Sequence, residues 1–207
     1  MSEFQRVLLG LHAQARRVDR EQALLGALGV GAFAYPHQID SVHRMITGTE
    51  CRWLLADEVG LGKTIQAIMV MRALAAQSPA RLRVALVVPD DLVSQWEEEL
   101  LCRGHVLALE HGDAAADTGN LMIKLARPSA LAKDTRIVPA RTDLLLVDEF
   151  PRFTVQVRRD LVNAARDIPN VVLMTATPSC RIQARCSALR SVVFRRGLSG
   201  VGCGCNR

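Results

Sequence analysis

The chain has 207 residues, of which 49% are hydrophobic, and this predicts one packed domain with little room for a second. It has no apolar run long enough to span a membrane and no start typical of a secretory signal, so we expect a cytoplasmic protein with no membrane contact. The formal net charge is +5, but residues 179–207 hold six arginines and no acidic residue. Residues 1–178 therefore carry a net charge of −1, and bulk charge does not predict nucleic-acid binding.

The first part of the chain is predicted to be helical. Residues 1–33 show apolar residues at rough helical spacing, and Pro36 should open a further helix that ends near Thr47. Two later helices are expected at 63–76 and 91–101, with Asp91 as the N-cap of the second.

Continuous apolar runs predict buried strands at 53–56, 84–88, 144–147 and 171–174. A strand at 105–109 and a short one at Ile137–Val138 are weaker expectations; 111–120 reads as a loop, and the rest of 121–140 is ambiguous. Apolar strands that alternate with helices predict an α/β fold with a mostly parallel sheet and helices on both faces. Three polar clusters, at 57–64, 148–149 and 175–177, follow strands, where such sheets bind ligands.

The first cluster has the sequence of a phosphate-binding P-loop between a strand and a helix. Its residues are Asp57, Glu58, Val59, Gly60, Leu61, Gly62, Lys63 and Thr64. Glycines let backbone N–H groups face a phosphate of ATP, Lys63 would reach the β- and γ-phosphates, and the Thr64 hydroxyl would ligate Mg²⁺. Asp57 stands where the strict pattern has glycine, and an ordinary loop is the alternative interpretation of the Gly-Lys-Thr triplet.

The other two clusters supply carboxylates and hydroxyls. Asp148 would hold Mg²⁺, mainly through water, and Glu149 would polarise the attacking water as a general base. The alternative for this pair is an acidic helix cap after a core strand. Thr175 and Thr177 could bond the γ-phosphate region or the carboxylates of Asp148 and Glu149, and an ordinary Thr-Pro turn is the alternative.

In their order along the chain, these segments resemble the motifs of Swi/Snf-family DNA translocases, which are superfamily-two helicase-like motors. Residues 57–64 resemble motif I in its Swi/Snf form, 87–100 motif Ia, 147–153 motif II and 173–178 motif III. The segment 35–38 lies where the family has its adenine-reading glutamine, so the resemblance implies that Gln38 pairs with the adenine edge. It covers about Ala34 to Pro178 and implies a RecA-like lobe at 34–178.

The resemblance implies a complete motor that uses ATP and Mg²⁺ and acts on duplex DNA, with a nucleoid location when bound. Because residues 1–178 carry a net charge of −1, we expect weak DNA binding by this lobe alone. The family's motor has a second RecA-like lobe bearing an arginine finger, and nothing after Pro178 is long enough to be one. Because such a finger raises the rate by about 10³–10⁵, we expect this chain to bind ATP with little turnover unless a second lobe acts in cis or trans.

Motif II departs from the family at two positions. Phe150 and Pro151 replace the usual alanine and histidine, and the histidine generally links the nucleotide site to motif III. Proline cannot make that polar link, so coupling is in doubt while Mg²⁺ binding through Asp148 should survive.

Three functional hypotheses stay open from the sequence. The first is the ATP-binding lobe of a DNA-dependent motor, and the second is a truncated, inactive ATP-binding module left by a gene remnant or frameshift. An unrelated P-loop NTPase is the third, which the placement of Gln38 and of 175–178 disfavours.

The tail, residues 179–207, is rich in arginine and cysteine and is expected to be disordered. Its cysteine spacing fits no common zinc pattern. A shifted reading frame or a natural arginine-rich terminus would each explain its composition. Lack of a second helicase lobe in the gene's other two frames would contradict the frameshift.

Overall fold

The computed structural model describes residues 21, 24, 30, 32–56, 60–104, 116–117, 120–128 and 137–176. The tail at 179–207 and most of the expected helical segment at 1–33 lie outside these residues, as does the expected strand at 105–109. Within the described residues, no helix combines the length and the apolar character that a membrane crossing needs.

The described strands form one six-stranded sheet in the order β1-β6-β5-β2-β4-β3. All neighbouring strands pair in parallel except β3, a two-residue strand that runs antiparallel to β4. The strands are β1 (Arg52–Leu55), β2 (Leu82–Val87), β3 (Ala116–Asp117), β4 (Leu121–Ala126), β5 (Leu144–Val147) and β6 (Asn170–Met174). The α/β fold with a mostly parallel sheet is therefore confirmed.

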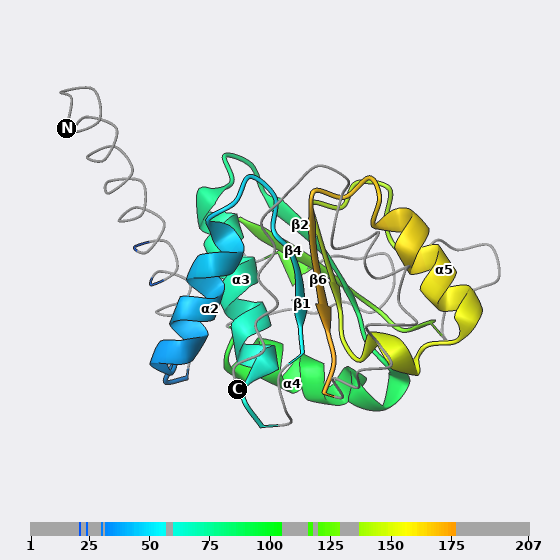
Figure 1. Ribbon diagram of the computed structural model, residues 1–207, viewed down its shortest axis with the longest axis horizontal. Helices are drawn as coiled ribbons and strands as arrows, with labels where there is room; N and C mark the ends of the chain where they lie inside the picture. Colours follow the sequence, from blue (N-terminus) through cyan, green and yellow to red (C-terminus); the bar gives the residue numbers. More distant parts are fainter. Residues whose placement is uncertain are drawn as a thin grey trace, which may run out of the picture.

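Helices cover both faces of this sheet, as the sequence predicts (Figure 1). Helices α2 and α3 lie on one face and α5 lies on the other (Figure 1). The bounds are α2 (Pro36–Ile46), α3 (Lys63–Gln77), α4 (Val93–Cys102) and α5 (Val155–Ala164), with 3₁₀ turns η1 (Asp90–Leu92) and η3 (Phe150–Arg152). Helix α3 is apolar nearly all round because it packs between α2 and the sheet.

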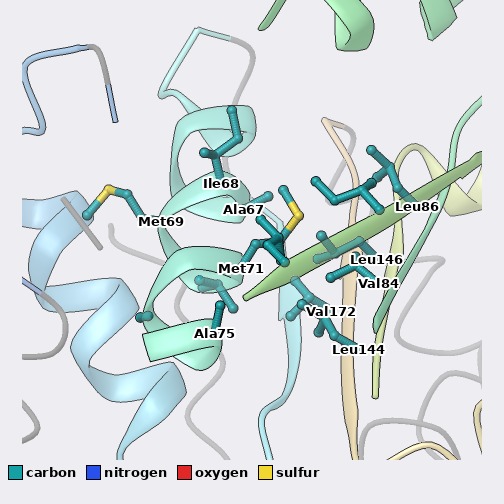
Figure 2. Close-up of a cluster of buried hydrophobic side chains, with 14 of the residues drawn as sticks. Ala67, Ile68, Met69, Met71, Ala75, Val84, Leu86, Leu144, Leu146 and Val172 are labelled. Atoms are coloured by element: carbon teal, nitrogen blue, oxygen red, sulfur yellow. The ribbon is translucent and has the colours of Figure 1, made fainter. Parts of the chain in front are cut away.

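The core has two layers, one on each side of the sheet, and strand β5 supplies both. Leu144 and Leu146 pack into the layer under α2, α3 and α4, whereas Leu145 and Val147 pack into the layer under α5. Figure 2 shows side chains of α3, among them Met71, pointing toward Leu146 and other strand residues. Burial of both faces explains why these strands are continuous apolar runs rather than alternating ones.

Three expectations about local structure are wrong or incomplete. Asp91 is not a helix N-cap: it lies inside η1, and α4 begins only at Val93. Ile137–Val138 is not a strand, because Val138 instead packs into the α5 layer from a bend. The ambiguous segment contains β4, which pairs with β2 over six residues, and the expected loop at 111–120 contains β3.

Buried polar groups join the sheet to α5 at the amino ends of the strands. The Arg52 guanidinium donates to the carbonyl oxygens of Ala165, at 2.9 Å, and Ile168, after the end of α5. A cation is favourable there because helix carbonyls carry partial negative charge.

A partly exposed ion pair lies at the same edge, between the start of β2 and the residue before β5. Arg83 donates two side-chain hydrogen bonds of 2.8 Å to Asp143, which hold the pKa of that carboxyl below its usual value.

Two leucine-to-alanine substitutions test the position of the core. Leu146 is 0% exposed on a central strand, so Leu146→Ala should lower the free energy of unfolding by about 2–5 kcal/mol. Leu101 on α4 is 52% exposed, and Leu101→Ala should change it by no more than about 0.5 kcal/mol. Urea denaturation of both variants measures the difference, and equal effects would contradict the layer assignment.

Candidate functional site

The three polar clusters predicted from the sequence follow three strands that lie side by side. Strand β1 leads into 57–64, β5 into Asp148, and β6, which lies between them, into Thr175. Because the three strands are parallel, their carboxyl ends meet at one edge of the sheet. This edge is the candidate site.

The described part of the P-loop segment has the backbone conformation that glycine permits. Gly60 and Gly62 have φ of +90° and +76°, in the region that other residues rarely adopt. A Cβ on Gly60 would meet nothing within 4 Å, so its backbone borders open space. Helix α3 begins at Lys63 and directs its N-terminus to this edge, where its dipole favours an anion. Asp57, Glu58 and Val59 lie outside the described residues.

Gln38 lies against the P-loop segment although 23 residues separate it from Leu61. Its Nε2 donates to the Leu61 carbonyl oxygen at 3.2 Å, and its Oε1 accepts from the Tyr35 N–H at 2.9 Å. The side chain is 1% exposed, and a Cβ on Gly62 would lie 2.2 Å from Nε2. Gly62 is therefore favoured by its dihedral angles, and a larger residue there would also displace the end of the Gln38 side chain.

The amide of Gln38 keeps hydrogen-bonding capacity in this arrangement. Its NH₂ group has a second hydrogen, and its oxygen has a second lone pair. Contact with an adenine edge is thus chemically open to it, and that role stays a prediction.

Asp148 is held by backbone and side-chain donors at the end of β5. Its N–H donates to the Val87 carbonyl oxygen at 3.0 Å, which extends the pairing of β5 with β2. Oδ1 accepts from the Glu149 N–H and Oδ2 from Trp96 Nε1, both at 2.9 Å. The carboxylate is thereby fixed in rotation while the residue is 9% exposed.

Trp96 is the site residue that the sequence reasoning missed. The sequence predicts a packing anchor rather than a base-stacking platform, and the side chain is indeed 2% exposed in the core. Because a buried indole N–H usually has a hydrogen-bond acceptor, the sequence indicates that Trp96 has a polar partner. The identity of that acceptor depends on α4 packing beside the end of β5, and no local pattern specifies this.

Glu149 joins the second cluster to the third. Its Oε1 accepts from the Ala176 N–H at 3.0 Å, and its Oε2 lies 3.5 Å from the Thr175 hydroxyl, which donates. Thr175 is buried and donates its own N–H to the Leu55 carbonyl oxygen at 3.0 Å. The contact between Thr175 and a carboxylate of the second cluster is one of the two arrangements predicted, and Thr177 lies outside the described residues.

The backbone of Glu149 is strained. Its φ of 45° and ψ of 45° place it in the left-handed region, which costs a residue other than glycine about 1–3 kcal/mol. This turn starts η3 and aims the Glu149 side chain toward the end of β6. Strain at such a position is typical of functional sites.

The residues after Glu149 are structural. Phe150 and Phe153 are buried in the α5 layer, and the Phe153 N–H closes η3 on the Phe150 carbonyl oxygen at 3.3 Å. Arg152 donates to both carboxylate oxygens of Asp91 at 2.9 Å on the surface. Pro151 takes no polar part, and Glu149 itself contacts the third cluster.

The donor groups at this edge fit a nucleotide that carries Mg²⁺. The carboxylate of Asp148 and the hydroxyl of Thr64 are hard oxygen donors, which Mg²⁺ prefers, and it usually takes its remaining ligands from water and phosphates. The glycine-rich turn and the start of α3 offer backbone N–H groups for those phosphates.

Comparison with known proteins identifies similar chains. Residues 35–110 match the SNF2-related domain. RNA polymerase-associated protein RapA from Pectobacterium carotovorum is 34% identical over 193 residues, and RapA from Serratia proteamaculans is 32% identical over 194. Each match covers 81% of this chain and 20% of the relative, so the chain spans about a fifth of the length of these curated relatives.

Solved structures show the same fold. The Sulfolobus solfataricus SWI2/SNF2 ATPase core in complex with dsDNA aligns with a TM-score of 0.63 at 22% identity, over 80% of this chain and 36% of that one. The UvsW helicase from bacteriophage T4 aligns with a TM-score of 0.58 at 12% identity, over 78% of this chain and 57% of that one. The fold is thus RecA-like, as predicted. The domain match and the RapA relatives support a Swi/Snf-family, superfamily-two helicase-like first lobe, and the structural likeness shows its fold.

Proposed function

We propose that this chain is the ATP- and Mg²⁺-binding lobe of a Swi/Snf-type DNA-dependent ATPase. The observation that supports this most is the meeting of three clusters at adjacent strand ends, with Glu149 bonded to Ala176 and close to Thr175. Membership of the SNF2 ATPase family implies the use of nucleotide and metal in general.

The P-loop segment would bind the phosphates. The N-terminus of α3 and the turn at Gly60 and Gly62 present backbone N–H groups to the phosphates, and Lys63 adds a full positive charge at the first position of the helix. Gln38 stands next to this turn, where it would select adenine.

Asp148 and Glu149 divide the remaining work. Bound Mg²⁺ would neutralise charge on the phosphates, with Asp148 holding it through water and Thr64 through its hydroxyl. Glu149 would orient and deprotonate the attacking water, because each of its carboxylate oxygens keeps a lone pair beyond the contacts with Ala176 and Thr175.

Turnover in this proposal depends on a second RecA-like lobe, in cis or in trans, that brings an arginine finger. The chain alone binds nucleotide and hydrolyses it slowly. The competing proposal is an ATP-binding module that never hydrolyses, and Pro151 favours it by removing the family's histidine. The contact of Glu149 with Thr175 favours the active motor, because a polar link between these two clusters persists without that histidine.

The partner of the complete motor would be duplex DNA. The Sulfolobus relative in the structural comparison is an ATPase core in complex with dsDNA, and the RapA relatives are RNA polymerase-associated by name. A cytoplasmic protein that joins the nucleoid when bound to DNA is consistent with this proposal.

Lys63→Ala tests the phosphate site. Loss of a charged hydrogen-bond donor costs about 1.5–3 kcal/mol, so ATP affinity should fall about 10- to 100-fold while the fold persists. Fluorescent ATP-analogue titration measures affinity, and circular dichroism checks the fold. Arg159→Ala removes one positive charge from the exposed surface of α5, on the other side of the sheet, and should leave affinity unchanged. Wild-type affinity in Lys63→Ala would contradict the P-loop assignment.

Two substitutions separate the roles of the acidic pair. Asp148→Ala should weaken the Mg²⁺-dependent part of ATP binding, whereas Glu149→Gln should keep that binding and remove residual hydrolysis. Titration of Mg²⁺ at fixed nucleotide and single-turnover phosphate release give the two readouts. If both variants behave like the wild type, the pair is only an acidic cap after a core strand.

Salt dependence tests DNA binding by this lobe. Each neutralised phosphate contributes about 0.9 to the slope of log affinity against log salt for duplex DNA. Residues 1–178 carry a net charge of −1, so they should bind weakly with a shallow slope, and the full chain with six more arginines should show a steeper one. Fluorescence anisotropy with a duplex oligonucleotide measures both. Tight binding by 1–178 at physiological salt would contradict this expectation.

A further inference from the structure

A buried side chain outside the three clusters contacts the carboxylate proposed to hold Mg²⁺. Trp96 lies on α4, 52 residues before Asp148 in the sequence, and its Nε1 donates to Asp148 Oδ2 at 2.9 Å. Its ring is 2% exposed and packs in the core layer that also contains α3. The indole therefore has little freedom to turn away from this acceptor.

The chemistry of the contact is specific. Indole has a single donor and no acceptor, so it interacts with the ionised carboxylate through one directed hydrogen bond. Hydrogen bonds to an ionised acceptor are shorter and about twice as strong as neutral ones. A tryptophan needed only for packing would be served equally well by a backbone carbonyl oxygen.

The two oxygens of Asp148 are held by different parts of the chain. The Glu149 N–H holds Oδ1 from within the same turn, while Trp96 holds Oδ2 from α4. Removal of the indole N–H would leave the Glu149 N–H as the one of these two donors that still restrains rotation of the carboxylate about its Cβ–Cγ bond. Each oxygen retains a lone pair, so these bonds leave room for the water shell of a cation.

A second contact joins the same two segments. Arg152, three residues after Glu149, pairs with Asp91 in η1, directly before α4. Both side chains of this pair are about half exposed, so the pair adds little stability. The turn after β5 is thus tied to η1 and α4 at two points, of which Trp96–Asp148 is the buried one.

We propose that Trp96 is a positioning residue that orients the Asp148 carboxylate toward Mg²⁺ through its indole N–H. This inference rests on the proposed function, because it assumes that Asp148 serves a metal-bound nucleotide. Partners that orient metal-site ligands typically contribute 10- to 100-fold to metal affinity. Loss of the N–H alone should therefore raise the Mg²⁺ concentration needed for half-maximal nucleotide binding about 10-fold or more.

The decisive variant removes the N–H and keeps the ring. Benzothienylalanine at position 96 replaces the indole nitrogen with sulfur at nearly constant volume, and Trp96→Phe is a second variant with a smaller ring. Both should need more Mg²⁺ in a titration at fixed fluorescent ATP analogue, with the Mg²⁺-independent part of binding unchanged. The same replacement at Trp53, the only other tryptophan in the chain, is the matched control and should leave the titration unchanged.

A spectroscopic readout tests the contact without nucleotide. The two indole N–H resonances of the ¹⁵N-tryptophan-labelled full chain are assigned with Trp53→Phe. In Asp148→Asn the Trp96 resonance should move upfield, because its acceptor loses charge, while that of Trp53 stays in place. An unmoved Trp96 resonance would overturn the inference even if the variants at position 96 fail to fold.

The remaining outcomes separate the two proposals. A wild-type chain without Mg²⁺-dependent nucleotide binding would contradict the proposed function, whatever the resonances do. Normal Mg²⁺ dependence in the wild type together with the same dependence in the benzothienylalanine variant would overturn the positioning role alone.

Discussion

Parallel pairing of β1, β6 and β5 is the constraint on which the candidate site depends. Parallel strands end at the same edge, so three segments that are spread over more than a hundred residues of sequence, from 57 to 176, bring their polar residues to one place. The side chains within these three strands are apolar except for Arg52 and Asn170, which are the first residues of β1 and β6 and lie at the opposite edge of the sheet. Chemistry can therefore begin only where each strand ends, at the P-loop segment, at Asp148 and at Thr175.

Contacts between the strand ends then convert proximity into a connected network. The Thr175 N–H donates to the carbonyl oxygen of Leu55, the last residue of β1, and thereby extends the β1–β6 pairing beyond the end of β6. Glu149 accepts from Ala176, so the end of β5 is bonded to the end of β6. Gln38 connects the start of α2 to Leu61. A shift of any one strand end would change the geometry of the next.

The sequence predicts the features that depend on local pattern. Buried strands, α3 and the three clusters follow from apolar periodicity, from glycines next to lysine and from carboxylates after a strand. Features set by tertiary packing were less accessible. Strand β4 was ambiguous because Lys124 interrupts its apolar run, and Asp91 resembles a helix cap but lies in a 3₁₀ turn. The contact between Trp96 and Asp148 depends on the adjacency of two segments, which periodicity does not encode.

The departures at Phe150 and Pro151 follow a physical logic in this fold. Phe150 packs in the α5 layer together with Phe153, so the phenylalanine that replaces the family's alanine fixes the turn by its burial. Pro151 fits η3 because its fixed φ suits the start of a short helix and its missing N–H removes no bond there. The turn is then rigid enough to hold Glu149 in its left-handed conformation, from which its carboxylate reaches Ala176 and Thr175. The Glu149 carboxylate thus makes the contact with the third cluster, whereas the family pattern has a histidine for this link at the position of Pro151.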